Sequence, residues 1–268
     1  MNALIDSINR LRFKQRNHQA GSFYLEQAKE FSKKIQGDID SFDRGLVTAI
    51  KKGEFPGKLY QEILAAFMPD YEKDLFRFYQ NQQFFILFRF LQYPFRYGLD
   101  AYVKPYERGL SLLSGKARVL EYGCGVPYGL IETLRKGKSN IEAICLVDLD
   151  LLHMDFTEHL IRRLAPSIPL EVHRLRNTEE IFEVSNSYNF FFGKDIFEHL
   201  YDPEEKLRGL MAKACDEAIC YFDFRDHGEK MHQHVSPNIG HLSIKMEELG
   251  FKKRGLIKVT TEFSRGIS

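Results

Sequence analysis

The segment 118–130, RVLEYGCGVPYGL, is the sequence feature that most constrains the fold. A short apolar run is followed by Glu121 and then by two glycines at alternate positions, Gly123 and Gly125. A helical pattern of apolar residues begins at Leu130. This order predicts a strand, a tight glycine turn and a helix. In an open α/β sheet such a turn lies at the carboxyl edge of the strand, where ligands bind.

The loop sequence also limits the ligand that it could hold. A dinucleotide loop follows the pattern G-x-G-x-x-G, and its third glycine would fall at residue 128, which is Tyr128. The carboxylate of Glu121, two residues before Gly123, would repel phosphate groups and would suit a ligand that carries an ammonium group. A glycine turn that binds nothing is the alternative interpretation of the same residues.

The loop resembles motif I of the class I S-adenosylmethionine (SAM) methyltransferases, which is written E/D-x-G-x-G-x-G. Glu121, Gly123 and Gly125 match the motif, whereas Pro127 stands where the family usually has its third glycine. Proline fixes φ and removes one N–H, so we expect the loop to differ in shape there. The resemblance implies SAM as the cofactor, held in part by the three matching residues.

From residue 117 onward, apolar runs alternate with helical patterns, which predicts an α/β domain. The run IEAICLV is apolar throughout, as in a strand that is buried on both faces. The expected fold is a Rossmann-like, doubly wound mixed sheet of six to seven strands. Strands are predicted at 118–122, 141–147, 170–173, 188–193 and 218–224, with one or two short ones within 251–263.

The predicted SAM-binding domain spans 111–268, and the resemblance to the family covers 117 to about 252. The remaining tail looks too short for the antiparallel hairpin with which the family usually ends. We therefore expect the last strands to be reduced.

Residues 1–110 show helical patterns without strands and predict a helical cap. The segment 75–106 is unusually aromatic, and its helix is expected to end before Pro94. Aromatic side chains dominate core burial, so core packing explains most of them. Tyr93 and Tyr97 are the candidates for lining the pocket of the methyl acceptor, because ligand pockets are common at domain junctions.

Asp148 follows the strand at 141–147, about twenty residues beyond the glycine turn. An acid at this position of a βαβ unit accepts hydrogen bonds from ribose hydroxyls, so Asp148 is the predicted ribose ligand. Asp150 is the alternative if the strand ends later. Leu149 is expected to pack on the adenine. In the family, the adenine amino group is usually contacted after the third strand, which here offers Asn177 or Arg176.

The segment 195–203, DIFEHLYDP, resembles a segment that follows the fourth strand in many small-molecule methyltransferases of this superfamily. Asp195, Glu198 and His199 are spaced so that their side chains could point one way from a single helical turn. They are the candidates for bordering the site of methyl transfer and for catalysis, with His199 as a candidate general base. Asp195 is also a candidate contact of the cofactor.

A histidine-rich segment follows the fifth predicted strand. Within it, His234 is a second candidate base and His232 a candidate acceptor contact. Some relatives with E-x-x-E-H and a distal histidine hold a divalent ion, so Asp195, Glu198, His199 and His234 are also candidate metal ligands. Structural roles, and a site that only aligns its two substrates, are the alternatives.

Composition excludes several classes of protein. The formal net charge of +1 gives no reason to expect nucleic acid as a partner, and no apolar run has the length of a membrane span. The first residues do not resemble a signal peptide. The four cysteines are scattered without a C-x-x-C pair, which favours buried, reduced thiols in a cytoplasmic protein.

The sequence therefore predicts a SAM-dependent methyltransferase that acts on a small metabolite held between the helical cap and the edge of the sheet. An RNA methyltransferase and a SAM-binding regulator or scaffold without catalysis are the alternatives. The oligomeric state is not predicted, and a homodimer remains one option.

Overall fold

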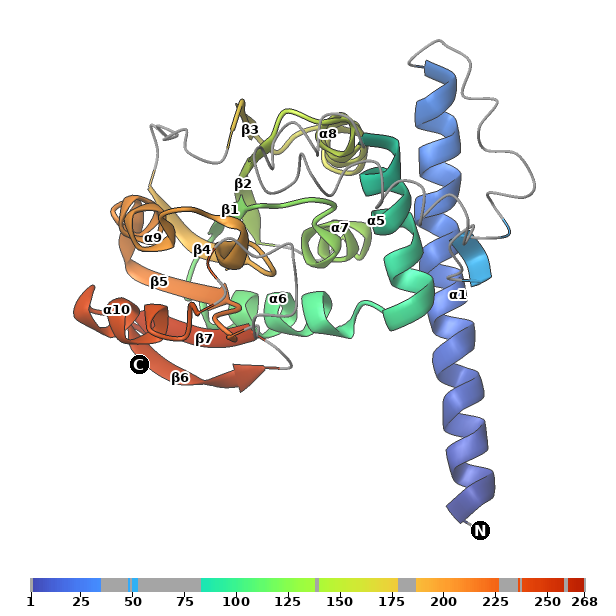
Figure 1. Cartoon of the computed structure of the whole chain (residues 1–268), viewed down its shortest axis with the longest axis horizontal. Helices are drawn as coiled ribbons and strands as arrows, with labels where there is room; N and C mark the ends of the chain where they lie inside the picture. Colours follow the sequence, from blue (N-terminus) through green and yellow to red (C-terminus); the bar gives the residue numbers. More distant parts are fainter. Residues whose placement is uncertain are drawn as a thin grey trace. The chain divides into compact units, whose positions relative to one another are not determined.

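The computed structural model describes residues 2–34, 48, 50–52, 83–137, 140–177, 187–226, 236, 238–257 and 260–267. The chain divides into two compact units (Figure 1). The first comprises Met1–Leu99 together with Leu151–Leu160, and the second comprises Asp100–Asp150 and Ile161–Ser268. The helical unit thus ends before residue 110 and includes a short segment from the middle of the chain.

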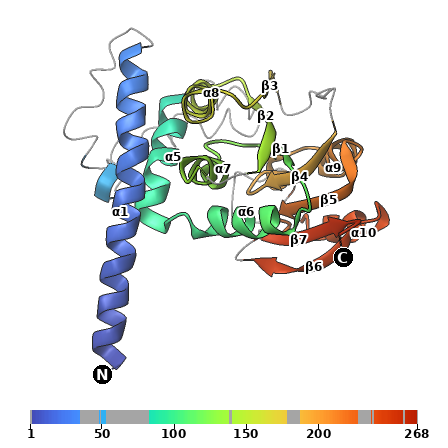
Figure 2. The same ribbon diagram turned by 180° about the vertical axis from the view of Figure 1, so that it is seen from behind.

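The second unit is built on one sheet of seven strands in the order β3-β2-β1-β4-β5-β7-β6 (Figure 2). β1 pairs with β2 and β4 in parallel, and β7 pairs antiparallel with β5 and β6. This is the predicted doubly wound, mixed sheet. The strands are β1 (Ala117–Tyr122), β2 (Ile141–Leu149), β3 (Leu170–Leu175), β4 (Tyr188–Gly193), β5 (Ala214–Phe222), β6 (Lys252–Ile257) and β7 (Thr260–Arg265).

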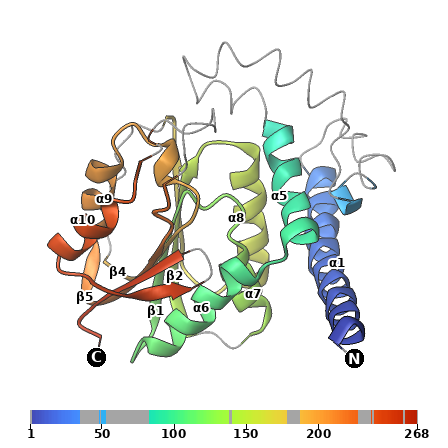
Figure 3. The same cartoon turned by 60° about the horizontal axis from the view of Figure 1, so that its bottom comes forward.

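The central strands are buried because their residues are apolar on both faces. Phe190, Phe191 and Phe192 of β4 and Ile219 and Cys220 of β5 are at most 3% exposed. Such strands must be covered by helices on both faces of the sheet. Figure 3 shows α7 on one side of the sheet and α9 and α10 on the other. The helices of this unit are α6 (Asp100–Leu112), α7 (Tyr128–Arg135), α9 (Pro203–Met211) and α10 (Leu242–Glu248).

Local signals fix two helix ends in this unit. Asp202 caps α9 by accepting a hydrogen bond from the N–H of Glu205 at 3.1 Å, and Pro203 occupies the first helical position. α10 ends at Glu248, and Gly250 follows its C-cap with a φ of +84°, which suits a helix terminus. α6 and α7 approach closely at Gly129, where a Cβ atom would lie 2.4 Å from the Tyr106 ring.

Two sequence predictions about this unit are wrong. The terminal strands are not reduced, because β6 and β7 each contain six residues and form a complete antiparallel hairpin. β5 begins four residues earlier than predicted and ends at Phe222 rather than Phe224. Asp223 and Arg225 consequently lie beyond the strand, at the carboxyl edge of the sheet.

The first unit contains α1 (Asn2–Lys34), α5 (Gln83–Tyr97) and most of α8 (Leu152–Leu164). Aromatic contacts join them: Phe31 lies 5.6 Å from Phe156, and Phe90 lies 5.3 Å from His153, measured between ring centroids. α5 continues past Pro94, contrary to the prediction. Pro94 has no N–H and therefore removes one hydrogen bond of the helix, yet the helix extends to Tyr97. The N–H of Gly98 then donates to the Pro94 carbonyl.

No helix in the described part of the chain is long and apolar enough to cross a membrane. All four cysteines are free thiols, and three of them, Cys124, Cys145 and Cys220, are buried as predicted.

Candidate functional site

The loop after β1 and the end of β2 are joined by hydrogen bonds. Gly123 and Gly125 both have positive φ angles, of 61° and 49°. The N–H of Gly123 donates to the carbonyl of Val147 at 2.8 Å. The carboxylate of Asp148 accepts from the N–H of Gly125 at 2.6 Å and from the N–H of Leu149 at 2.7 Å. The glycine loop and the end of β2, which are the two segments predicted to bind the cofactor, therefore form one hydrogen-bonded structure.

This structure lies beside the point where the order of the strands reverses. From β1 the chain proceeds outward through β2 and β3, and it then returns to the other side of β1 to form β4 and β5. Crevices at the carboxyl ends of strands at such a point are the usual ligand sites of open α/β sheets. The segment after β4 approaches the loop closely, because a Cβ atom on Gly123 would lie 2.4 Å from the Ile196 side chain.

Glu121, at the carboxyl end of β1, is only 2% exposed. The hydroxyl of Tyr106 on α6 donates a hydrogen bond to its Oε1 atom. Burial raises the pKa of Glu121 to about 8, although the hydrogen bond from Tyr106 opposes the shift. The carboxyl group is therefore largely protonated at neutral pH in the absence of a cationic ligand. Its contact with the cofactor stays a prediction.

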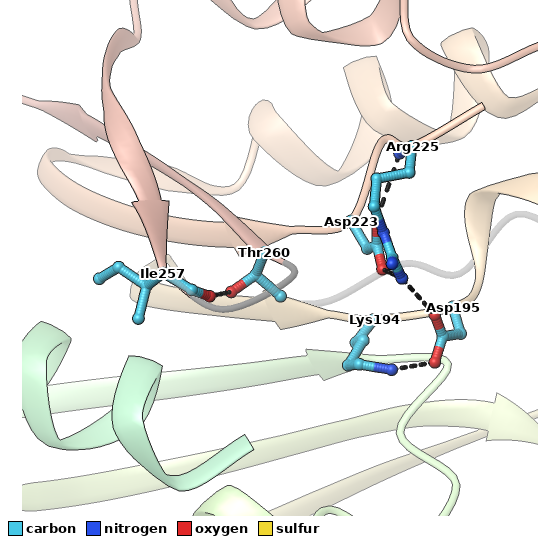
Figure 4. Close-up of polar contacts among 6 residues, drawn as sticks. All are labelled: Lys194, Asp195, Asp223, Arg225, Ile257 and Thr260. Atoms are coloured by element: carbon cyan, nitrogen blue, oxygen red, sulfur yellow. Dashed lines mark hydrogen bonds and ion pairs between the residues drawn. The ribbon is translucent and has the colours of Figure 1, made fainter. Parts of the chain in front are cut away.

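A cluster of charged side chains occupies the ends of β4 and β5 (Figure 4). Arg225 donates from Nε to Oδ1 of the buried Asp223 at 2.7 Å and also contacts its Oδ2 atom. Asp195 lies 3.6 Å from the same guanidinium group and forms an ion pair with Lys194. The Lys194 ammonium group in turn lies 5.0 Å from the centre of the Tyr102 ring, within cation–π distance.

Asp195 has a φ angle of +54° and is the one non-glycine residue in the described part of the chain with a positive φ. Such a conformation is strained for a residue with a side chain and is frequent at functional sites. Burial opposes ionisation of Asp195, but the charge and hydrogen bond of Lys194, with help from Asp223 and Arg225, lower its pKa. Asp195 is thus held as an anion after the carboxyl end of β4.

Glu198 lies in the short 3₁₀ helix η1 (Phe197–His199) and is 1% exposed. Burial, together with the negative charges of Asp195 and Asp223, raises its pKa to about 7. A group that titrates near neutral pH suits a general base. The N–H of Ser236 donates to the carbonyl of Glu198 at 3.0 Å, so the chain after β5 is bonded to this helix.

The other predicted site residues are placed as follows. Leu149 is buried at the end of β2, and Asn177 is exposed after β3. His199 is half-buried in η1. Tyr93 and Tyr97 lie on α5 in the helical unit, with ring centroids 5.0 Å apart, and their contact with an acceptor stays a prediction. His232 and His234 lie outside the described residues.

The three predicted metal ligands that the structure describes are not brought together. Among the described residues, Asp195, Glu198 and His199 do not form a group of converging ligand atoms. Within that same part of the chain, the three side chains that do converge are Cys145, Glu171 and His173, on β2 and β3. A divalent ion at the end of β4 therefore has no support from this geometry.

Sequence reasoning missed four residues of the site, although a signal was present for three of them. Asp223 and Arg225 follow a parallel strand, as Asp148 does, and the same rule would have selected them had the end of β5 been placed correctly. Lys194 directly follows β4 and carries the same signal, whereas Tyr106 carries none. Tyr106 reaches Glu121 only because α6 packs on α7 beside the sheet.

No protein-family model matches the sequence, and no curated protein matches it either. Several solved structures resemble the chain, SAM-dependent methyltransferases among them. One, from Aquifex aeolicus, has a TM-score of 0.45 and 14% identity, covering 64% of this chain and 94% of its own. A methyltransferase from Pyrococcus furiosus has a TM-score of 0.42 and 14% identity over 59% of this chain and 79% of its own.

The [4+2]-cyclase SpnF also resembles the chain, with a TM-score of 0.47 and 13% identity. The matched region covers 59% of this chain and 59% of the cyclase. At these identities the likeness concerns the fold and not the reaction.

Proposed function

We propose that this protein binds SAM at the carboxyl ends of β1 and β2 and transfers its methyl group to a small-molecule acceptor. The observation that carries the proposal is the hydrogen bond from the N–H of Gly125 to the carboxylate of Asp148, at 2.6 Å. It joins a glycine turn and an acid at the position where α/β sheets hold a nucleoside.

Asp148 has the capacity to bind a ribose. An ionised carboxylate offers about four lone-pair sites, and the N–H groups of Gly125 and Leu149 occupy two of them. A carboxylate at this position of a βαβ unit suits the hydroxyls of a ribose. The two amide bonds also fix the orientation of the carboxylate before a ligand arrives, which lowers the entropic cost of binding.

The surroundings of the loop favour a sulfonium nucleoside over a dinucleotide. Tyr128, where a dinucleotide loop would have its third glycine, is 1% exposed and packs against Tyr102. Pro127 precedes α7 as its N-cap and offers no N–H to a phosphate. Asp148 adds a carboxylate, which repels phosphates and attracts a cationic ligand.

The proposed reaction is an in-line displacement. A nucleophilic atom of the acceptor forms a bond to the methyl carbon, the carbon–sulfur bond breaks, and its electron pair stays on sulfur as the neutral thioether of S-adenosylhomocysteine. Alignment of the two reactants supplies much of the acceleration in such a step. Glu198, with a pKa raised to about 7, would accept the proton of the acceptor.

A small metabolite is the proposed acceptor because the formal net charge is only +1 and bulk charge gives no reason for a polyanion. The strained Asp195 and the Asp223–Arg225 pair would contact the polar groups of that acceptor. They lie at the end of β4 and β5, next to the predicted position of the methyl group.

Calorimetry with SAM and S-adenosylhomocysteine tests the proposal, using the wild type and two variants. Asp148→Ala should weaken binding at least about 100-fold, because two charge-assisted hydrogen bonds are lost. Asp150→Ala is the matched control, since Asp150 is exposed and pairs with Arg174 on β3. It should change the affinity by no more than about twofold.

NAD⁺ and ATP serve as competing ligands in the same experiment. Binding of either of them in place of SAM would overturn the proposal. Transfer of a labelled methyl group from SAM to extracted metabolites, to RNA, or to neither then separates the proposed enzyme from an RNA methyltransferase and from a protein that binds SAM without turnover.

A further inference from the structure

Three metal-ligating side chains converge on one face of β2 and β3. Cys145 on β2 lies opposite Glu171 on β3, and Val147 lies opposite His173. Glu171 and His173 are two positions apart on the same strand, so their side chains project from the same face of the sheet. One ligand atom from each of the three residues lies within 4.8 Å of the other two.

Direct contacts hold these groups in place. Nε2 of His173 lies 2.7 Å from Oε1 of Glu171, and the hydroxyl of Tyr188 donates to Oε2 of Glu171 at 2.8 Å. Tyr188 is the first residue of β4, so side chains from three strands meet at this position. The tyrosine fixes the orientation of the carboxylate, as an outer partner does for a metal ligand.

The set of donor atoms selects for a particular kind of ion. A thiolate and an imidazole disfavour Mg²⁺ and Ca²⁺, which prefer oxygen ligands, and favour Zn²⁺. Ligand atoms at about 2.0–2.3 Å from a tetrahedral Zn²⁺ lie roughly 3.3–3.7 Å apart. Small rotations of the half-buried Glu171 and His173 would bring the present arrangement to these distances.

An ion could reach this position because β3 is at the edge of the sheet. The side chain of His173 is 21% exposed and that of Glu171 is 30% exposed, whereas Cys145 is buried behind them. An ion at this site would therefore face water on the side of Glu171 and His173 and the protein interior on the side of Cys145. Three protein ligands leave the fourth position of a tetrahedral ion for water or for the Tyr188 hydroxyl.

We propose that Cys145, Glu171 and His173 form a binding site for a thiophilic divalent cation, with Zn²⁺ as the ion that fits best. The bound ion would stabilise the β2–β3 edge of the sheet. A metal ion binds the thiolate of Cys145 and displaces the thiol proton, so affinity should increase with pH.

Cobalt(II) is the probe, because a thiolate bound to Co²⁺ gives a charge-transfer absorption band that oxygen and nitrogen ligands do not give. The full chain, stripped of metal with a chelator, should develop this band with one equivalent of Co²⁺, and Zn²⁺ should abolish it. Zn²⁺ at about one hundred times its Kd should raise Tm by about 5 °C or more.

Three variants make the test specific. Cys145→Ser should lose the charge-transfer band, and His173→Ala should weaken Co²⁺ binding at least about tenfold, within the 10–100-fold range for loss of a group that supports a metal site. Cys215→Ser is the matched control, because Cys215 is a half-buried thiol outside the cluster, and it should keep the band. Circular dichroism confirms that each variant is folded.

Two results would overturn the proposal. One is Co²⁺ binding without the charge-transfer band in the wild type, or no binding at all. The other is a band that persists in Cys145→Ser and disappears in Cys215→Ser. SAM calorimetry on Cys145→Ser, which should match the wild type, separates this outcome from failure of the methyltransferase proposal.

Discussion

The hydroxyl of Tyr106 donates a hydrogen bond to the Oε1 atom of Glu121, and both side chains are at most 2% exposed. A residue of α6 thereby fixes the side chain of Glu121, which lies two residues before the first glycine of the loop. Because burial raises the pKa of Glu121 from 4.5 to about 8, the native protein retains a proton that the unfolded chain loses at lower pH.

Glu121→Gln should therefore change how stability depends on pH. In the wild type this group makes the free energy of unfolding fall by up to about 1.4 kcal/mol per pH unit between pH 5 and 8, since the native state binds more protons than the unfolded state. The stabilisation is complete below the unfolded pKa and is lost as the pH rises through the folded pKa. Urea unfolding at pH 6 and at pH 9 measures the difference.

Glutamine keeps a hydrogen-bond acceptor for Tyr106 and cannot ionise. From pH 6 to pH 9 the free energy of unfolding of the wild type should therefore fall by about 2–3 kcal/mol more than that of the variant. An equal pH dependence for both proteins would mean that Glu121 is already ionised in the native state.

Tyr106→Phe should lower the free energy of unfolding by about 1–3 kcal/mol, because it leaves a buried acceptor without its donor. The hydrogen bond lowers the pKa of Glu121, so its loss should raise that pKa further. Thermal unfolding measures the first effect. Tyr201→Phe is the control, since Tyr201 is 52% exposed, and it should change stability by no more than about 0.5 kcal/mol.

Gly123→Ala should destabilise the protein by about 1–3 kcal/mol and abolish SAM binding. The residue has a φ of +61°, and the added Cβ atom would lie 2.4 Å from Ile196. Gly209→Ala in α9 is the matched control: no atom lies within 4 Å of its Cβ position, and the exchange should stabilise the helix by about 1 kcal/mol. Equal Tm values for the two variants would contradict the described loop.

Glu198→Gln should reduce kcat about 10²- to 10⁴-fold while leaving the Kd for SAM unchanged. In the wild type kcat should rise with pH through about 7, as Glu198 loses its proton, and this rise should be absent in the variant. Glu204→Gln, which alters a carboxylate on α9 paired with Arg208, is the control and should retain full activity. An unchanged pH profile in Glu198→Gln would assign the base to another residue.

From residue 117 onward, several strands could be predicted because they are largely apolar runs between turn signals, namely β1, β2, β4 and the second half of β5. The joint occurrence of Gly123, Gly125 and Asp148 also identified the loop, and the structure connects its two halves by a hydrogen bond. Strand ends were less accurate. β5 begins with the mixed sequence ACDE, so only pairing with β4 and β7 defines where it starts and stops.

Contacts between segments far apart in the chain could not be predicted. Tyr106 lies 15 residues before Glu121, and nothing in the sequence distinguishes it from the other aromatic residues of that region. Asp195 resembled one member of a cluster of metal ligands, but its positive φ angle orients it toward Lys194 and Arg225. Backbone strain of this kind depends on surrounding structure and has no signature in residue type.

The position of β7 has a consequence for how the protein is made. This strand lies between β5 and β6 although it follows both in the chain. A nascent polypeptide that has emerged only as far as β6 therefore presents an unpaired edge of β5, because β7, the neighbour of β5 on that side, is not yet in place. Such an edge can pair with other chains. During translation the protein should accordingly depend on chaperones until residues 260–265 leave the ribosome.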